Sequence, residues 1–157
     1  MSAPESASPS VPPIALHAEP GHLMRRAHQI AVATFYEVHG RQVTPVQYAI
    51  LRALQQAPGI DQVTLAQRVA LDTSTTADIA TRLEKKGWIV RELLPRRQRA
   101  LRLTDAGRQV LDDLLPHVNA MNALLLQGLD AQEQEAFVRL LRKFVHLANE
   151  SDTPPQG

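Results

Sequence analysis

Apolar side chains recur at intervals of three and four residues along most of this chain, a spacing that predicts amphipathic helices. We expect helices at about residues 21–39, 44–57, 61–69, 72–87, 104–125 and 130–149. Pro116 should kink the helix that covers residues 104–125. Five of these helices start at a residue whose side chain favours a helix cap, namely Thr44, Asp61, Asp72, Thr104 and Asp130.

Two short segments instead predict strands, and the second of them alternates between apolar and polar residues. They cover residues 88–91 and 101–103, and residues 95–99 between them should form the tip of a hairpin. The predicted order is helix, helix, short helix, helix, two strands, helix, helix. The pattern therefore predicts a mainly helical fold with one small β-hairpin.

The composition agrees with a single helical domain. It also indicates which residues fold and where in the cell the protein is expected. Of 157 residues, 44% are hydrophobic and 4% are aromatic, which favours an aliphatic helical core. Residues 1–13 and 151–157 are rich in Ser and Pro and should be disordered, so the folded part covers about 14–150. No apolar run approaches the roughly 20 residues that cross a bilayer, and the first residues lack the pattern of a secretory signal. We expect a cytoplasmic protein that does not enter a membrane.

Residues 61–86 combine a short helix, a tight link and a longer helix, which is the layout of a helix–turn–helix. The second helix of this motif enters the major groove of DNA by its amino-terminal end. Short polar side chains there allow close approach and hydrogen bonds to phosphates or bases. The alternative is that the hydroxyl run only caps the helix. The residues of this helix predicted to contact DNA are Thr73, Ser74, Thr75, Thr76, Asp78 and Arg82.

The predicted hairpin is strongly basic. Residues 82–102 contain eight basic and two acidic side chains, a local net charge of +6 in a chain whose net charge is +1. Arg96, Arg97 and Arg99 stand at the hairpin tip, where guanidinium groups suit phosphates and a narrow minor groove. A solvated charged turn is the alternative, but a basic hairpin directly after a helix–turn–helix favours DNA as the partner. We therefore predict a winged helix–turn–helix at about residues 44–104.

Four groups of residues agree with one known family in identity and spacing. They are Leu65-Ala66, Leu71-Asp72-Thr73-Ser74-Thr75, the run from Arg82 to Arg91, and Arg96-Arg97 followed by Leu103-Thr104-Asp105-Ala106-Gly107. In these residues the chain resembles the MarR family of bacterial regulators, and the resemblance covers nearly all of residues 20–148. It implies a homodimeric repressor that binds a palindromic operator in double-stranded DNA. It also implies that a small molecule lowers the affinity for DNA.

The resemblance implies that terminal helices, about 20–39 and 104–149, form the dimerisation region. The hydrophobic pattern supports this, since the last two predicted helices carry more apolar surface than one thin helical lobe covers. The apolar positions in question are Leu111, Leu114, Leu115, Val118, Phe137, Leu140, Leu141 and Phe144.

Two positions depart from the family pattern. Pro95 stands where the family usually has an acidic residue, and the wing is a residue or two short, so the usual acid–arginine pair inside the wing is absent. Thr73 stands where relatives often have arginine. We expect a different role for Arg97 and a different base preference.

Cationic and aromatic side chains on the first two predicted helices suggest an effector site. Residues 21–30 and 44–49 resemble a subgroup that controls the breakdown of aromatic acids, including repressors of nicotinate degradation. A carboxylate needs a cation and an aromatic ring needs a flat apolar wall. We expect a small aromatic carboxylate, such as a hydroxylated pyridine acid. The candidate contacts are His22, Arg25, Arg26, His28 and Tyr48; the alternative is that they are surface or dimer-interface residues.

Enzyme chemistry, cofactors and metals are not expected. The chain has no cysteine, which excludes disulfides, thiolate catalysis and thiol-based sensing. Its six histidines match no tight ligand spacing, and no nucleophile elbow or phosphate loop is present. The remaining alternative is a winged helix that binds only proteins, and the arginine-rich hairpin argues against it. The histidines are His17, His22, His28, His39, His117 and His146.

Overall fold

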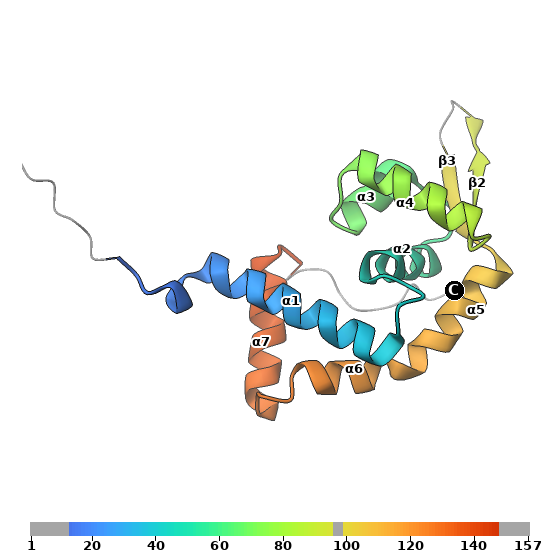
Figure 1. Cartoon of the computed structure of the whole chain (residues 1–157). Coiled ribbons are helices and arrows are strands. Elements are labelled where there is room, and N and C mark those ends of the chain that lie inside the picture. The colour runs from blue at the N-terminus through green and yellow to red at the C-terminus, as the bar shows by residue number, and fades with distance from the viewer. Residues whose placement is uncertain (1–12, 96–98, 148–157) are drawn as a thin grey trace, which may run out of the picture.

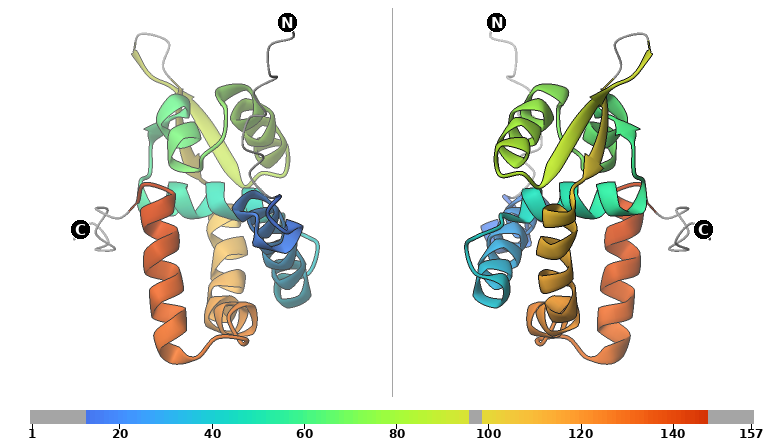
Figure 2. Two further views of the ribbon diagram at one scale, coloured as in Figure 1. Left: turned by 90° about the vertical axis from the view of Figure 1, so that its left-hand side faces the viewer. Right: turned by 90° about the vertical axis from the view of Figure 1, so that its right-hand side faces the viewer.

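The structure, a computed structural model, describes residues 13–95 and 99–147 and has two parts (Figure 1). The head contains α2, α3, α4 and a small sheet, and the platform contains α1, α5, α6 and α7; Figure 2 shows both from two sides. The helices are α1 (Pro20–His39), α2 (Pro45–Gln56), α3 (Gln62–Arg68), α4 (Thr73–Lys85), α5 (Asp105–Leu114), α6 (Val118–Leu125) and α7 (Ala131–Phe144). The strands are β1 (Ile60–Asp61), β2 (Ile89–Leu93) and β3 (Arg99–Leu103), and 3-10 turns cover Leu16–Ala18 and Leu115–His117.

The predicted capping residues start the predicted helices. Thr44 and Gln47 form a reciprocal capping box, with N···O distances of 3.1 and 3.2 Å. Asp130 and Glu133 form a second box at the start of α7, at 2.9 Å in both directions. Such bonds satisfy backbone N–H groups that the first helical turn leaves unpaired, so these local signals are readable in the sequence.

The sheet has three strands rather than the predicted two. Strand β3 lies in the middle, antiparallel to β2 on one side and to β1 on the other. The additional strand β1 pairs Ile60 with Leu101 and Asp61 with Ala100. A strand of two residues is too short to show an alternating pattern, and its pairing partners lie 41 and 39 positions away in sequence, so the local sequence did not reveal this strand.

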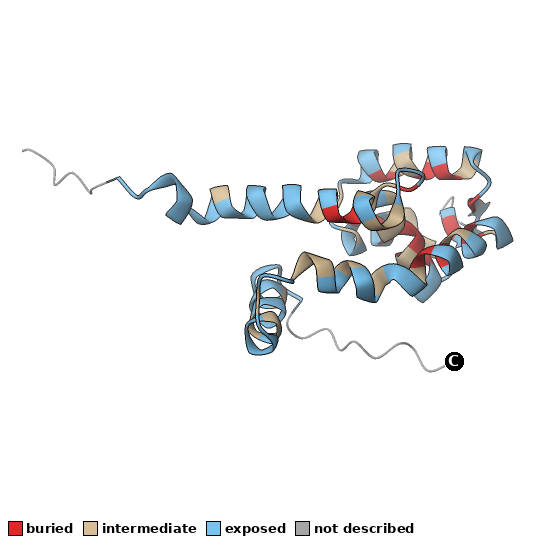
Figure 3. Ribbon diagram, turned by 60° about the horizontal axis from the view of Figure 1, so that its bottom comes forward, coloured by how far each residue is buried: buried red, intermediate tan, exposed pale blue. Residues whose placement is uncertain are grey.

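The core lies in the head and at the junction with α5. Leu51, Leu65, Leu83, Leu101 and Leu111 come from α2, α3, α4, β3 and α5, and all five are fully buried. Figure 3 shows the buried residues gathered there, whereas the first half of α1 and all of α7 are exposed or half-buried. Burying a large aliphatic side chain contributes about 1.5–3 kcal/mol, so this cluster stabilises the head.

The structure corrects the predicted dimer surface at two positions. Leu111 and Leu114 are 0% and 8% exposed, because they lie on the face of α5 that packs against α2. Both leucines therefore belong to the core of a single protomer. The predicted residues of α7 are exposed, and Leu115 and Val118 are half-buried.

The last two predicted helices differ from the structure in two places: the first is interrupted and the second ends early. The kink at Pro116 is a full interruption, a 3-10 turn that separates α5 from α6. Helix α7 ends at Phe144 rather than near residue 149, because His146 adopts a left-handed φ of 64° and the Leu147 N–H donates to the Arg142 carbonyl at 2.8 Å. Apart from residue 13, the tails predicted to be disordered lie outside the described residues. Among the described residues, no helix combines the length and apolarity that spanning a membrane requires.

Candidate nucleic-acid interface

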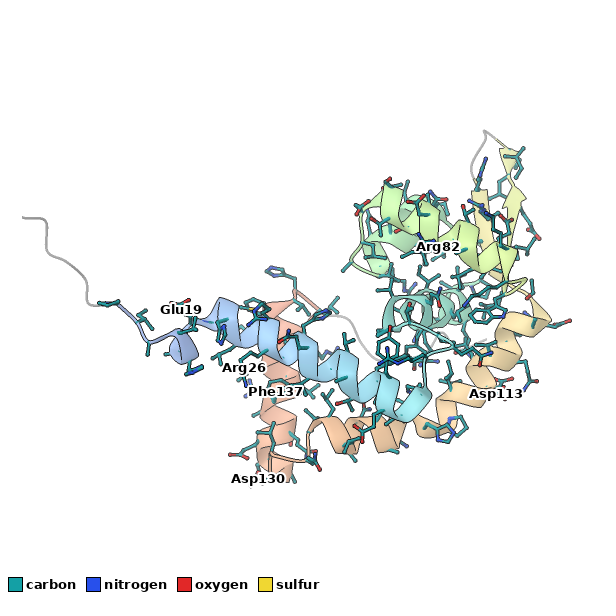
Figure 4. The ribbon with its side chains drawn as sticks, in the orientation of Figure 1. Glu19, Arg26, Arg82, Asp113, Asp130 and Phe137 are labelled. Carbon is teal, nitrogen blue, oxygen red and sulfur yellow. The ribbon has the colours of Figure 1, made fainter. Side chains whose placement is uncertain are left out.

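Helix α4 and the β2–β3 hairpin lie at the end of the head that is remote from the platform (Figures 1 and 2). Thr73, Ser74, Thr75 and Asp78 are exposed along the first turns of α4. Arg82 is exposed further along the same helix, where Figure 4 labels it. The opposite face of α4 buries Ala80 and Leu83. This arrangement presents short polar side chains to an approaching partner.

Two threonines at the start of α4 are already engaged within the protein. Thr76 is 0% exposed and its hydroxyl donates to the Asp72 carbonyl at 2.9 Å, so the prediction that Thr76 faces DNA is wrong. Its spacing of four and seven residues from the buried Ala80 and Leu83 was the available signal. The Thr75 hydroxyl donates to the Asp72 carboxylate at 2.6 Å, and hydrogen bonds from Thr75 lower the pKa of that carboxyl.

Only part of the predicted basic tip is described. Arg99 is exposed as the first residue of β3 and pairs in register with Leu93. Arg96 and Arg97 lie outside the described residues. Nearer the base of the hairpin, Arg102 forms an exposed ion pair with Glu92 at 3.2 Å.

The sequence places Arg91 in a predicted strand and in the basic stretch, and it assigns no partner to this residue. Its side chain is 13% exposed and donates to the Glu84 carboxylate on α4 at 2.6 and 3.0 Å. A further hydrogen bond reaches the Thr81 hydroxyl at 3.1 Å. These hydrogen bonds from Arg91 lower the pKa of Glu84. Arg91 therefore joins β2 to α4 instead of adding a free positive charge to the surface.

The predicted effector contacts are not gathered at one place within a protomer. Arg25, Arg26 and His28 are exposed on the first half of α1, and His22 there is half-buried. Tyr48 on α2 instead packs against Phe35 near the other end of α1, with ring centroids 5.7 Å apart. Even His28 precedes Phe35 by seven residues, roughly 10 Å along a helix. Two helices that adjoin in sequence order need not align their polar residues, and the sequence did not show this offset.

A cluster of rings surrounds His39 where α1, α2 and the 3-10 turn Leu115–His117 meet. Its ring centroid lies 4.7 Å from Phe35, 6.1 Å from Tyr48 and 6.4 Å from His117. Neither nitrogen of His39 has a hydrogen-bond partner among the described residues. Burial, and then the charge of His117, lower the pKa of His39. The surroundings therefore favour the neutral imidazole.

We expect acid to destabilise the fold through His39. Above its ordinary pKa of 6.5, His39 is neutral in both the folded and unfolded chains. As the pH falls from there through the lowered pKa of the folded state, the unfolded chain takes up the proton first, so the free energy of unfolding decreases. Urea unfolding at fixed protomer concentration, at pH 7.5 and pH 5.5, measures this loss.

Substitution separates His39 from the other histidines. His39→Phe should reduce the difference in unfolding free energy between the two pH values, because a phenyl ring cannot take up a proton. An unchanged pH dependence in His39→Phe would assign the effect to other groups.

An apolar groove runs along the platform between α1, α6 and α7, with a volume of 550 Å³. Phe137, Leu141 and Phe144 line it from α7 and are 41%, 45% and 59% exposed. Met24 and Ile30 line the α1 side and are 42% and 53% exposed. Figure 4 labels Phe137 on α7. An exposed apolar surface of this kind is typical of a protein interface.

The fold and its exposed elements define a winged helix–turn–helix protein. A helix–turn–helix formed by α3 and α4 is followed directly by a β-hairpin, and a separate helical platform carries the apolar groove. The chain belongs to the MarR family: the family model matches residues 43–101, and transcriptional regulators at least 30% identical to the chain match most of their length.

Relatives and solved structures agree with this assignment. The chain is 31% identical to the HTH-type transcriptional repressor NicR from Pseudomonas putida, over 90% of this chain and 92% of that one. The structure of the PcaV transcriptional regulator from Streptomyces coelicolor, in complex with its natural ligand, matches with a TM-score of 0.80 and 36% identity, over 88% of this chain and 100% of that one. BpsR from Bordetella bronchiseptica, whose DNA binding is regulated by 6-hydroxynicotinic acid, matches with a TM-score of 0.79 and 28% identity, over 85% and 98%.

Proposed function

We propose that this regulator is a homodimeric repressor that binds a palindromic operator through α4 and the wing and that an aromatic carboxylate releases it. The observation that carries the proposal is the exposed amino-terminal half of α4, which presents short polar side chains beside a basic hairpin. In a winged helix–turn–helix, such a helix reads bases in the major groove and the wing contacts the backbone or minor groove. Action on chromosomal DNA would place the protein in the cytoplasm.

Within this proposal, the residues of α4 have different roles. Thr73, Ser74, Asp78 and Arg82 are free to face DNA. The hydroxyl of Thr75 donates a hydrogen bond to the carboxylate of Asp72, which caps α4. Replacing Thr75 would therefore disturb the start of α4 as well as any DNA contact. Arg96, Arg97 and Arg99 would contact phosphates from the wing.

We expect helix and wing substitutions to have different effects on DNA binding. Replacing Arg96 and Arg97 with Ala should weaken binding to all sequences and reduce the salt slope by about 1 for each lost phosphate contact. Ser74→Ala should change sequence preference, by about 1–3 kcal/mol if a base contact is lost. Fluorescence anisotropy at several salt concentrations, with duplexes selected from genomic DNA and scrambled duplexes, distinguishes the two effects.

The matched control is Arg139→Ala, which removes one exposed positive charge from α7 on the platform. Its affinity and salt slope should equal those of the wild type. If the unmodified protein shows no salt-dependent binding to any duplex, the alternative of a winged helix that binds only proteins replaces the proposal.

The effector proposal has a narrower basis. PcaV was solved with its natural ligand and BpsR responds to 6-hydroxynicotinic acid, and both have folds like this one. On this chain, His22, Arg25, Arg26 and His28 offer cations and rings on α1, and the geometry within one protomer leaves Tyr48 out of the set. Because α1 joins the platform to the head, a ligand there can change the spacing of the two α4 helices, provided that it prefers the spacing that does not fit DNA.

Calorimetry with a panel of benzoates and pyridine carboxylates tests the effector, paired with DNA release. We expect at least one acid to bind and to dissociate the selected duplex. Arg26→Gln should weaken acid binding, whereas Arg41→Gln, which removes a cation stacked on Tyr36, should not. Absence of binding by every acid, or binding that leaves the DNA complex intact, would remove the effector from the proposal and leave DNA binding standing.

A further inference from the structure

The Arg91 side chain connects α4, the second helix of the helix–turn–helix, to the hairpin. From β2, its Nε and one terminal nitrogen donate to the same oxygen of Glu84, at 3.0 and 2.6 Å. The same terminal nitrogen also reaches the Thr81 hydroxyl at 3.1 Å. The Thr81 hydroxyl in turn donates a hydrogen bond to the Ala77 carbonyl of α4 at 2.9 Å. Arg91 is thus bound to two points on α4, one turn apart.

The position of this contact bears on DNA recognition. Thr81 and Glu84 are half-buried and lie one turn apart on α4, and the exposed Arg82 lies between them in sequence. Recognition by this fold needs α4 and the hairpin to reach DNA together, so their relative angle must be fixed before DNA arrives. A guanidinium with several donors in one plane fixes an angle better than a single ammonium does.

The contact also changes the charge near the DNA-facing surface. The side chain of Glu84 is 39% exposed, and an unpaired carboxylate on α4 would repel phosphates that approach this helix. Arg91, whose side chain is only 13% exposed, forms an ion pair with that carboxylate. The pair is neutral overall, so Arg91 adds no net positive charge to the surface. The other ion pair of the hairpin, between Arg102 and Glu92, is roughly half exposed on both sides, and both of its members belong to the hairpin.

We propose that Arg91 is a positioning residue for DNA recognition, which sets the angle between α4 and the hairpin and masks the Glu84 carboxylate from phosphates. The inference rests on the proposed DNA binding. It assigns to Arg91 an effect on the discrimination between operator and other DNA, not a contact with DNA.

Arg91→Lys keeps the charge and removes the planar set of donors. We expect its affinity for a duplex selected by the wild type to fall about tenfold, while its affinity for a scrambled duplex stays within about twofold. Arg102→Lys is the matched control, because it makes the same exchange in the ion pair confined to the hairpin; its ratio of the two affinities should not change. Circular dichroism and thermal unfolding confirm that the variants retain the fold.

The masking role has a separate readout in pH. In Arg91→Gln the Glu84 carboxylate loses its hydrogen-bond donor and keeps only the more weakly acting charge of Arg99 on β3, so approaching phosphates favour its protonation more than in the wild type. Operator affinity of this variant should therefore rise as the pH falls from 7 to 5, relative to the wild type. The double variant Arg91→Gln with Glu84→Gln should lose that relative rise, because no carboxylate remains at this position.

The outcomes distinguish this inference from the proposed function. If the wild type binds no DNA, the proposed function fails and the inference fails with it. If the wild type binds its selected duplex but Arg91→Lys keeps the wild-type ratio of the two affinities, the positioning role is overturned and the proposed function stands. This holds whether both affinities are unchanged or both fall equally. Should Arg91→Lys unfold, Glu84→Ala with Thr81→Val removes both acceptors of the Arg91 guanidinium from α4, and an unchanged ratio in that variant overturns the role.

Discussion

Gly107→Ala should lower the free energy of unfolding by about 3 kcal/mol, at the upper end of what overpacking a core costs. Gly107 lies in the first turn of α5, after the Thr104 cap. A Cβ placed there would overlap the backbone carbonyl of Trp88, and the nearest atoms are all backbone. Because backbone cannot swing aside as a flexible side chain does, either α5 or the start of β2 must move.

A displacement of α5 or β2 in Gly107→Ala would affect both the head and the platform. The same Trp88 carbonyl accepts a hydrogen bond from the Thr104 N–H at 3.0 Å, so displacement also weakens the link between the hairpin and α5. Leu111 and Leu114 of α5 are buried in the head core and would lose contacts. Denaturant unfolding at fixed protomer concentration measures the loss.

The control for this prediction is Gly21→Ala. Gly21 lies in α1, and a Cβ there meets no atom within 4 Å. Alanine in a helix is favoured over glycine by roughly 0.5–1 kcal/mol, so this variant should be as stable as the wild type or slightly more so. Equal stability of Gly107→Ala and the wild type would mean that α5 accommodates the methyl group.

The second large effect is expected at the apolar groove of the platform. If the proposed dimer forms there, Leu141→Asp should separate it into monomers and reduce operator affinity by at least about 100-fold, because one head then binds one half-site alone. Leu141 lines the groove between α1, α6 and α7 and is 45% exposed in a single protomer. A second copy seated there would bury it, and a buried unpaired carboxylate is strongly unfavourable.

Sedimentation at micromolar concentration tests this together with DNA binding. The head core contains no residue of α7, so the variant should keep its folded head. Leu93→Asp is the control for the oligomeric state, since Leu93 is an apolar residue of β2 that is 74% exposed and lies outside the groove. A wild-type protein that sediments as a stable monomer with native helicity would contradict the dimer.

Within the site, the sequence and the structure differ residue by residue. The sequence placed Ser74, Asp78 and Arg82 on the exposed face of α4, and they lie there. It also included Thr76, whose burial follows from helical spacing once the core face of α4 is known. It counted Arg91 in the net charge of the basic stretch and assigned it no partner, since nothing local reveals one seven positions away on another element.

The sequence by itself determined the elements that depend on near neighbours. Helix caps such as Thr44 with Gln47, the break at Pro116 and the apolar face of α4 all arise from interactions within about four residues. Only the tertiary structure decided what meets across elements. It paired β1 with β3, joined Arg91 to Glu84, placed Tyr48 beside His39 rather than near Arg26, and left the groove beside α7 open. Such contacts depend on how whole helices and strands pack against one another. The shapes of their buried faces determine this packing, and no repeating pattern in the sequence encodes it.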